Sequence, residues 1–460
     1  MIPFWQTQQH DAARLALIDD RGQQLSYGEL TARVNALAGQ LPARSLVFLF
    51  CQNQADAVIG YLACLQADAV ALLLDSALDE SLTQQLIETY HPTLLWQPQE
   101  TGYQLTATGL TPWPLHDDLA LLMSTSGSTG SPKLVRLSKR NLQSNAASIA
   151  HYLQIDGDER GLVSLPINYV YGLSIINSHL HAGATLLLTG HSVMQRELWN
   201  FVRETRASSF AGVPYTWEML RKLRFMRMDL PDLRTLTQAG GKLSPALQQE
   251  YTEFARQSGK RFIVMYGAAE ATSRMAWLPP EEADARYGFI GKPIPGGEFL
   301  LLDETNQPIT TPNTQGELIY RGDNVALGYA ERGEDLALGD RFSGTLHTGD
   351  IATFDEAGFY RIVGRKKRFL KIFGNRVGLD EMEGLLKTAF PDVSLACDGR
   401  DDLLCIFLTD ASHAATVKQY AAQLSHLHAS AFHTISLADI PKDPAGKTLY
   451  HRLKEHVPHS

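Results

Sequence analysis

Short apolar runs alternate with amphipathic stretches of helical length over the first part of the chain. Between Leu46 and Tyr266 these runs include LVFLF, AVALLL, TLLW, GLVSL, ATLLL, SSFAGV and FIVMY. Strands that alternate with helices form parallel, doubly wound sheets. Because roughly ten such runs exceed one ordinary sheet, we expect an α/β fold with two doubly wound sheets packed through helices. Ligands of such sheets bind at the carboxyl ends of the strands.

The pattern changes after Pro293. The segments FLLLD, GELIY, IATFD and FYRIV are separated by Gly, Asn, Asp and Pro turns, without helical periodicity between them. This texture predicts a small β-barrel over about residues 290–365. After the basic run from Arg365 to Arg368, strand-like LLCIFLT and helix-like AATVKQYAAQL indicate a small α+β domain. We therefore predict a large N-terminal domain over residues 1–366 and a small C-terminal domain over residues 367–460.

Composition narrows the class of protein. A chain of 460 residues with 44% hydrophobic and 20% charged residues is typical of a soluble globular protein. The formal net charge of -9 gives no overall attraction to nucleic acid or anionic membranes. No apolar run approaches the roughly 18 residues of a membrane span, and the N-terminus lacks the pattern of a signal peptide. Four cysteines without C-x-x-C spacing indicate neither a zinc site nor a disulfide framework, so we expect a reduced, cytoplasmic protein.

The stretch STSGSTGSPK, from Ser124 to Lys133, carries the first chemical signal. Small side chains leave backbone N–H groups exposed, and such groups beside a lysine suit a polyphosphate. The stretch is not a Walker A sequence, because G-x-x-x-x-G-K-[ST] is absent. The triplet Gly446-Lys447-Thr448 also fails, since Pro441 stands where the first glycine should be. The loop therefore predicts a nucleotide site of another type.

The sequence STSGSTGSPKLVRLSKRNL resembles the phosphate loop of the adenylate-forming superfamily, which includes acyl-CoA synthetases, aryl-acid ligases, luciferases and peptide-synthetase adenylation domains. The resemblance continues in order through LSYGEL, MYGAAE, GELIYRGDNVALGY, TGD, GRKKRFLKIFGNRV and PKDPAGK. It departs at Lys139, where histidine is usual, and at Ala269, where threonine is usual. It implies ATP and Mg²⁺ as cofactors and the thiol of coenzyme A or phosphopantetheine as a co-substrate.

The resemblance implies a nucleotide site assembled from several motifs. Tyr266 corresponds to a ring that stacks on adenine, and Asp350 to a carboxylate that accepts hydrogen bonds from the ribose hydroxyls, with Arg365 as a second ribose contact. Glu270 corresponds to a catalytic, metal-binding carboxylate, which fits the preference of Mg²⁺ for few carboxylates plus phosphate oxygens. The other residues implied in ATP binding are Thr125, Ser126, Gly127, Ser128, Thr129, Gly130, Lys133, Gly240, Gly241, Gly267 and Ala268.

The C-terminal domain supplies the remaining implied roles. Lys447, in PKDPAGK, corresponds to a catalytic lysine that bridges the substrate carboxylate and the α-phosphate, where it neutralises developing charge. In the superfamily this domain is mobile and rotates about a hinge between two half-reactions. Lys367 corresponds to the hinge. Lys371 and Gly374 correspond to the loop that lines the thiol tunnel, although a basic run of this kind is also typical of a solvated face.

The acid pocket is expected around Tyr169, Val170, Gly172 and Val213. Amino-acid adenylating relatives carry an aspartate, which pairs with the substrate ammonium, at the position that Val170 occupies. An unpaired buried ammonium is costly, so an α-amino acid is disfavoured. The apolar and aromatic surroundings suit a fatty, short acyl or aryl acid and do not separate these classes.

The function predicted from the sequence is ATP-dependent activation of a carboxylic acid and its transfer to a thiol, with release of AMP and pyrophosphate. The acceptor remains open, because an acyl carrier protein presents the same arm as coenzyme A. A basic helix face with Arg221, Lys222, Arg224 and Arg227 could dock such a carrier, or be merely solvated. The alternatives are an amino-acid adenylation enzyme of the peptide-synthetase type, and a non-catalytic nucleotide-binding relative, which the departure at Ala269 favours.

Overall fold

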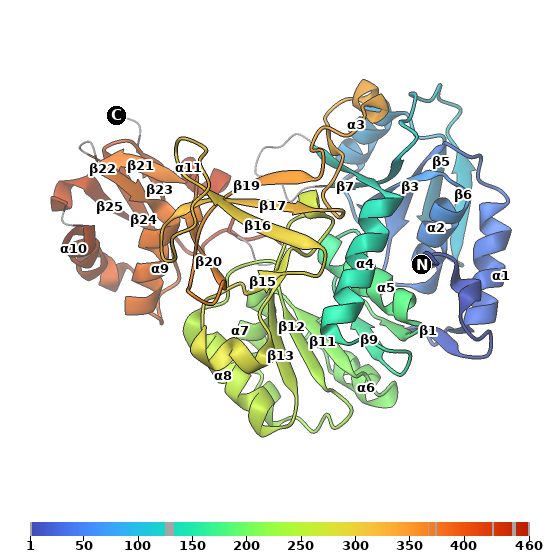
Figure 1. Cartoon of the computed structure of the whole chain (residues 1–460), viewed down its shortest axis with the longest axis horizontal. Helices are drawn as coiled ribbons and strands as arrows, with labels where there is room; N and C mark the ends of the chain where they lie inside the picture. The colour runs from blue at the N-terminus through green and yellow to red at the C-terminus, as the bar shows by residue number, and fades with distance from the viewer. Residues whose placement is uncertain are drawn as a thin grey trace.

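The structure is a computed structural model of the whole chain. It describes residues 2–124, 133–366, 368–372, 375–425, 427–443 and 448–458. Two large sheets form the bulk of the molecule, and a smaller sheet and a C-terminal unit lie beside them (Figure 1).

The first large sheet has nine strands. They are β1 (Leu15–Asp19), β2 (Gln24–Ser26), β9 (Arg160–Val163), β10 (Thr185–Leu188), β11 (Ser209–Gly212), β12 (Thr235–Gln238), β13 (Arg261–Tyr266), β14 (Ala276–Trp277) and β15 (Lys292–Pro293). Their order is β15-β14-β13-β12-β11-β9-β10-β1-β2. The strands from β13 to β1 pair in parallel, and β2, β14 and β15 are antiparallel additions at the edges.

The second large sheet has seven strands, in the order β18-β8-β7-β4-β3-β5-β6. Their bounds are β3 (Leu46–Cys51), β4 (Val70–Asp75), β5 (Leu94–Pro98), β6 (Tyr103–Ala107), β7 (Leu119–Ser124), β8 (Leu134–Ser138) and β18 (Gly328–Ala330). The strand β7 ends at the edge of the phosphate-loop motif, and β8 begins just after it. This places the motif at a strand end, where ligands of doubly wound sheets bind.

Helices pack between the two sheets and on their outer faces. The four inner helices are α1 (Tyr27–Ala38), α2 (Ala55–Gln66), α4 (Lys139–Leu153) and α5 (Val170–Ala182), which share one hydrophobic cluster with both sheets. The outer helices are α3 (Glu80–Tyr90) on the seven-stranded sheet, and α6 (Arg196–Glu204), α7 (Pro214–Lys222) and α8 (Pro245–Gln257) on the nine-stranded sheet. The predicted pair of sheets packed through helices is therefore confirmed (Figure 1).

Capping explains where two inner helices begin. Ser26 and Glu29 form a reciprocal capping box at the start of α1, in the LSYGEL motif. Ser138 and Asn141 form the equivalent box at the start of α4, and the Asn141 side chain also donates to the carbonyl oxygens of Asp323 and Val325. A capping residue satisfies backbone N–H groups that the first turn leaves unpaired. The SKRNL motif thereby ties α4 to the segment before β18.

The region predicted as a small β-barrel forms a four-stranded antiparallel sheet in the order β16-β17-β19-β20. Its strands are β16 (Gly297–Leu302), β17 (Gly316–Gly322), β19 (Thr345–Phe354) and β20 (Tyr360–Arg365). Its apolar face packs against residues that follow β13. Short 3-10 helices complete this part of the chain: η1 (Thr7–Gln9), η2 (Phe225–Arg227), η3 (Ala269–Ala271), η4 (Pro280–Ala285) and η5 (Gly333–Ala337).

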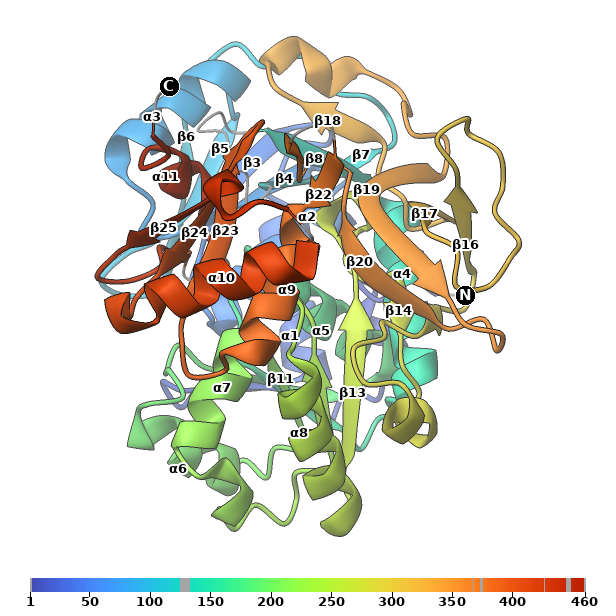
Figure 2. The same ribbon diagram turned by 90° about the vertical axis from the view of Figure 1, so that its left-hand side faces the viewer.

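The C-terminal unit has its own hydrophobic clusters. Its elements are β21 (Phe369–Ile372), β22 (Asn375–Gly378), α9 (Leu379–Ala389), β23 (Leu395–Arg400), β24 (Leu403–Leu408), η6 (Ala411–His413), α10 (Ala414–Ser425), η7 (Ala429–Ala431), β25 (Phe432–Ser436) and α11 (Tyr450–Lys454). Figure 2 faces this unit and shows α10 on the side away from the two large sheets. The domain boundary at residue 367 stays a prediction, since Lys367 lies outside the described residues.

No helix in the described part of the chain is both long and apolar enough to cross a membrane.

Candidate nucleotide and acid site

Three predicted ribose and adenine residues lie together where β13 ends beside the four-stranded sheet. Asp350 of β19 and Arg365 of β20 are cross-strand partners, and the Arg365 Nε lies 3.0 Å from the Asp350 Oδ1. The Tyr266 hydroxyl donates to the Asp350 Oδ2. The Asp350 backbone N–H donates to the Thr348 Oγ1 over 3.0 Å, which orients the TGD turn. The Asp350 side chain is thus held in place by two donors on different strands.

Electrostatics fix the protonation of this group. Burial, and then the neighbouring Asp350 carboxylate, raise the pKa of Tyr266 well above its ordinary value. The phenol therefore remains a neutral hydrogen-bond donor at physiological pH. A buried carboxylate with a guanidinium and a phenol as partners is a fixed acceptor, which is the property that recognition of a sugar diol requires.

Glycines bring the backbone close to both candidate pockets. A Cβ at Gly267 would lie 1.6 Å from the Ser273 carbonyl oxygen, so no other residue fits there. Gly240 has a φ of 84°, and a Cβ on it would lie 2.6 Å from the Tyr169 hydroxyl. The predicted adenine-side glycine and the predicted acid pocket are therefore neighbours.

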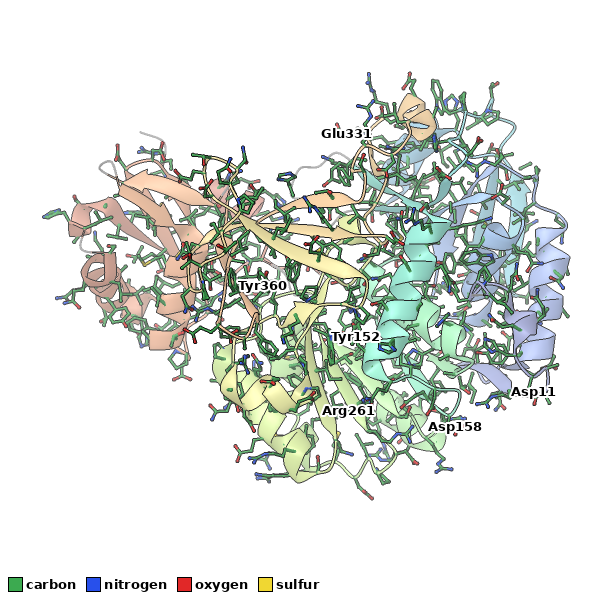
Figure 3. All side chains as sticks on the ribbon, viewed as in Figure 1. Asp11, Tyr152, Asp158, Arg261, Glu331 and Tyr360 are labelled. Atoms are coloured by element: carbon green, nitrogen blue, oxygen red, sulfur yellow. The ribbon has the colours of Figure 1, made fainter. Side chains whose placement is uncertain are left out.

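The predicted magnesium residue lies in a cluster that sequence reasoning only partly found. Glu270, in η3, accepts a hydrogen bond of 2.8 Å from the Tyr329 hydroxyl on β18. The Lys133 Nζ lies 3.6 Å from the centre of the Tyr329 ring and 3.5 Å from the Glu331 Oε1 (Glu331 is labelled in Figure 3). Tyr329 therefore links the phosphate-loop lysine to the metal-site carboxylate. It is the last residue of the GELIYRGDNVALGY motif, to which the sequence analysis gave no role.

A buried arginine positions this tyrosine. Arg136 on β8 is fully buried, and its guanidinium donates to four backbone carbonyl oxygens: those of Tyr329 (3.0 Å), Leu327 (3.1 Å), Gly339 (3.0 Å) and Leu338. These bonds fix β18 and the loop after it against β8. The signal in the sequence is a charged residue inside the apolar run LVRL, next to the phosphate loop.

The acid-pocket residues lie at the starts of two helices. Tyr169 is the N-cap residue of α5 and Val170 is its first residue, while Val213 is the N-cap residue of α7. Gly172 permits a close approach, because a Cβ there would lie 2.2 Å from the Pro166 carbonyl oxygen. Burial raises the pKa of Tyr169. These residues converge on Gly240, as the sequence predicted for a pocket beside the nucleotide.

The C-terminal unit reaches the same region. Lys442 and Thr448 form an isolated antiparallel bridge, and the Lys442 Nζ lies 5.7 Å from the centre of the Tyr215 ring on α7. The negative charge of Asp443 also favours a higher pKa for Tyr169. The described residues that flank Lys447 in the sequence therefore lie against the candidate acid pocket.

Several predicted residues cannot be located further. Those that lie outside the described residues are Thr125, Ser126, Gly127, Ser128, Thr129, Gly130, Lys367, Gly374 and Lys447, and the side chain of Lys371 is also outside them. Their roles stay predictions from the resemblance.

The departures from the superfamily pattern have local partners. The Lys139 Nζ lies 2.8 Å from the Asp68 Oδ1, so this lysine forms a surface ion pair away from the site. Ala269, the first residue of η3, packs against the large hydrophobic cluster between the sheets. On the basic face of α7, Arg221 is paired with Glu250 over 2.8 Å. That pair reduces the positive charge available to a docking partner.

The two helix-filled sheets, the strand-end phosphate motif and the C-terminal unit define the fold of the adenylate-forming enzymes, as the sequence predicted. The chain belongs to the AMP-binding enzyme family, which it matches over residues 4–107 and 96–330.

Curated relatives have names of one kind. The chain is 32% identical to an oxalate–CoA ligase of Arabidopsis thaliana over 60% of this chain and 54% of the relative. It is 30% identical to a 2-succinylbenzoate–CoA ligase of Bacillus pumilus over 73% of this chain and 68% of the relative. It is 29% identical to a feruloyl-CoA synthase of Amycolatopsis over 79% of this chain and 78% of the relative. The chain thus spans about half the length of the oxalate–CoA ligase.

Solved structures confirm the fold. The o-succinylbenzoate CoA synthetase of Bacillus subtilis, in complex with its acyl-adenylate intermediate, is similar with a TM-score of 0.80, 23% identity and 98% coverage of both chains. An anthranilate CoA ligase in complex with anthranoyl-AMP is similar with a TM-score of 0.79 and 18% identity, over 99% of this chain and 97% of that chain.

Proposed function

We propose that the protein uses ATP to convert a carboxylic acid to an acyl-adenylate, and then transfers the acyl group to the thiol of coenzyme A. The observation that carries the proposal is the Asp350 carboxylate, held by Tyr266 and Arg365 beside the Glu270–Tyr329–Lys133 cluster. The first group suits a ribose and the second suits phosphates with a metal ion. The relatives' names, all CoA ligases or synthases of carboxylic acids, favour coenzyme A as the acceptor.

The residues present fit a magnesium ion. Magnesium binds through one or two carboxylates together with phosphate oxygens, and Glu270 supplies one hard oxygen ligand beside the phosphate-loop lysine. No cluster of three or more metal-ligating side chains occurs among the described residues, so the site does not compete as an all-protein metal cage. When bound, Mg²⁺ would neutralise charge on the departing pyrophosphate. The B. subtilis synthetase has been solved with ATP and a magnesium ion.

The first half-reaction forms an O–P bond between a carboxylate oxygen of the acid and the α-phosphorus, and it breaks the bond to pyrophosphate. Lys133 places a positive charge beside the phosphates, and Asp350 orients the ribose. Lys447 would reach the carboxylate and the α-phosphate from the C-terminal unit, as the resemblance implies. Positioning and charge stabilisation supply most of the rate enhancement in such a step.

In the second half-reaction the sulfur of the thiol attacks the acyl carbon, and AMP leaves with the bonding electron pair. We propose that the C-terminal unit turns about Lys367 between the two steps, with Lys371 and Gly374 lining the thiol path. A cytoplasmic location is part of the same proposal. All four cysteines are buried free thiols, which is typical of proteins in reducing compartments.

The test follows pyrophosphate release from ATP and Mg²⁺ over a panel of fatty, short acyl, aryl and amino acids, with hydroxylamine to trap the adenylate. Lys447→Ala and Asp350→Asn serve as controls. We expect release with a class of carboxylic acids, a reduced rate in both variants, and thioester formation with coenzyme A. Thioester formation with a carrier protein alone would change the acceptor. Tight ATP binding without pyrophosphate release would refute catalysis and support the non-catalytic alternative.

A further inference from the structure

Arg274 is a buried cation that the proposed function does not use. It lies between η3 and β14, and its exposed fraction is 3%. Its guanidinium carbon lies 3.9 Å from the centre of the Tyr171 ring, its Nη1 donates to the Ser273 Oγ over 2.6 Å, and its Nε lies 3.4 Å from the Met265 Sδ. Within the described part of the chain, no carboxylate pairs with it.

Such a charge is costly to bury unless it gains a partner. A ring face, one hydroxyl and a thioether sulfur replace only part of the hydration that a guanidinium loses. The other fully enclosed charge near the site, Arg136, shows what compensation looks like, since four carbonyl oxygens accept from it. Arg274 therefore has donor capacity that an anionic ligand can use.

The guanidinium lines a narrow cavity between the helices α4 and α5 and the inner face of the nine-stranded sheet. In Figure 3, Tyr152 on α4 and Arg261 at the start of β13 mark this part of the molecule. The space open to the centres of water molecules is about 30 Å³. That is room for about two water molecules, or for one small polar group, and not for a long acyl chain.

The polar lining of the cavity is unusual for a space between a helix layer and a sheet. Besides Arg274, its polar residues include Ser174, Ser178, His179, Ser209, Thr235 and Thr237. The His179 Nδ1 lies 2.8 Å from the Ile175 carbonyl oxygen, and burial lowers the pKa of His179, so this ring is neutral and does not compete with Arg274 for an anion. Glu159, at the opposite end of the cavity, is already paired with Arg234 over 3.1 Å.

The cavity adjoins the candidate acid pocket. The Tyr171 ring, on which Arg274 stacks, lies 6.3 Å from the Tyr169 ring, measured between centres. The Tyr171 hydroxyl donates to the Thr237 carbonyl oxygen over 2.9 Å, on the strand that leads to Gly240. Burial raises the pKa of Tyr171 to about 12, although the charge of Arg274 acts in the opposite direction. Arg274 thus lies one aromatic layer inside the pocket opening formed by Tyr169 and Gly240.

We propose that Arg274 binds a second carboxylate at the far end of the acid substrate, so that the preferred substrates are dicarboxylic acids. The proposal rests on the proposed function, in which the first carboxylate attacks ATP near Gly240. It adds a specificity-determining residue and a substrate class. The second carboxylate would accept hydrogen bonds from the guanidinium and from the cavity hydroxyls, which satisfies the charge on both partners.

The experiment compares dicarboxylic acids of increasing length with their own monomethyl esters, so that each pair differs in one negative charge. Pyrophosphate release and adenylate trapping are measured for the wild type, Arg274→Met and Arg274→Lys. Arg160→Met is the matched control, because Arg160 is a partly buried arginine bonded to the Thr205 carbonyl oxygen, away from the cavity. Thermal unfolding of each variant reports its folding.

We expect the wild type to prefer a diacid over its monoester by at least about 10-fold in kcat/KM, as a charged hydrogen-bonded pair provides. Arg274→Met should lose this preference through a higher KM for the diacid while monoester activity persists. Arg274→Lys should retain part of the preference, and Arg160→Met all of it. Equal kcat/KM for diacid and monoester in the wild type would overturn the inference and leave the proposed function intact. Equal losses on both substrates in Arg274→Met, with a lowered unfolding temperature, would assign Arg274 a structural role instead. Absence of pyrophosphate release with every acid would overturn the proposed function itself.

Discussion

The hydroxyl of Tyr329 offers a sharp test of the site, because Tyr329→Phe removes one oxygen and keeps the ring. The hydroxyl donates to the Glu270 Oε1 over 2.8 Å, while the ring face holds the Lys133 Nζ at 3.6 Å. Burial and the Glu270 charge both raise the pKa of Tyr329, so the hydroxyl stays protonated and donates. A hydrogen bond to a charged group contributes about 1.5–3 kcal/mol. Because Glu270 is half-buried, we take the lower end of that range.

A loss of about 1.5 kcal/mol corresponds to a roughly 10-fold decrease in kcat/KM for ATP. The assay is pyrophosphate release at several Mg²⁺ concentrations, with thermal unfolding measured in parallel. Tyr329→Leu also removes the ring face and should lose a further factor of a few, as exposed cation–π contacts contribute about 0.5–1 kcal/mol. Tyr360→Phe is the control, since that hydroxyl makes a 3.3 Å bond to the Phe299 carbonyl oxygen. Unchanged kinetics in Tyr329→Phe at every Mg²⁺ concentration would show that this bond does not position Glu270.

Three further predictions follow from local geometry. Gly267→Ala places a Cβ 1.6 Å from the Ser273 carbonyl oxygen, so we expect a loss of about 1–3 kcal/mol or more in unfolding free energy and weaker ATP binding; wild-type values in denaturation and calorimetry would contradict this. Ser138→Ala removes the cap of α4 and should cost about 1 kcal/mol in denaturant unfolding, with Asn141→Ala similar in effect and an unchanged midpoint in both as the contrary result. Burial lowers the pKa of His179 from 6.5, so the unfolded chain takes up the proton first and stability falls as the pH decreases below that value. His179→Gln should reduce this slope between pH 7 and pH 5, and parallel curves would refute the assignment.

Much of the fold could be predicted from the sequence because its determinants are local. Apolar runs such as LVFLF became β3, and the strand-end position of the phosphate motif followed from the alternation of strands and helices. The convergence of Tyr266, Asp350 and Arg365 came from motif order alone. The sequence contained no information on how these three would contact each other. Their contacts depend on the register between β19 and β20 and on where β13 ends against that sheet.

The residues that sequence reasoning missed act over long distances in the chain. Arg136 is bonded to carbonyl oxygens 191 to 203 positions later, and neither composition nor periodicity predicts such partners. The tyrosine that it positions is at the end of a recognised motif, but its role is visible only when β18 pairs with β8. Similarly, Arg274 in SRMAW reads as an ordinary surface residue until the structure shows it buried.

The two buried arginines illustrate how satisfaction of donors separates structural from functional charges. Arg136 spends its hydrogen bonds on backbone oxygens of the chain, so its burial is compensated by the fold and its role is to hold β18. Arg274 faces a ring, a hydroxyl and a sulfur, and lies at the edge of a polar cavity. Evolution tolerates uncompensated burial where binding supplies the missing partner, because the energy of pairing then contributes to affinity and discrimination. The same physical criterion therefore assigns one arginine to the scaffold of the nucleotide site and the other to the choice of acid.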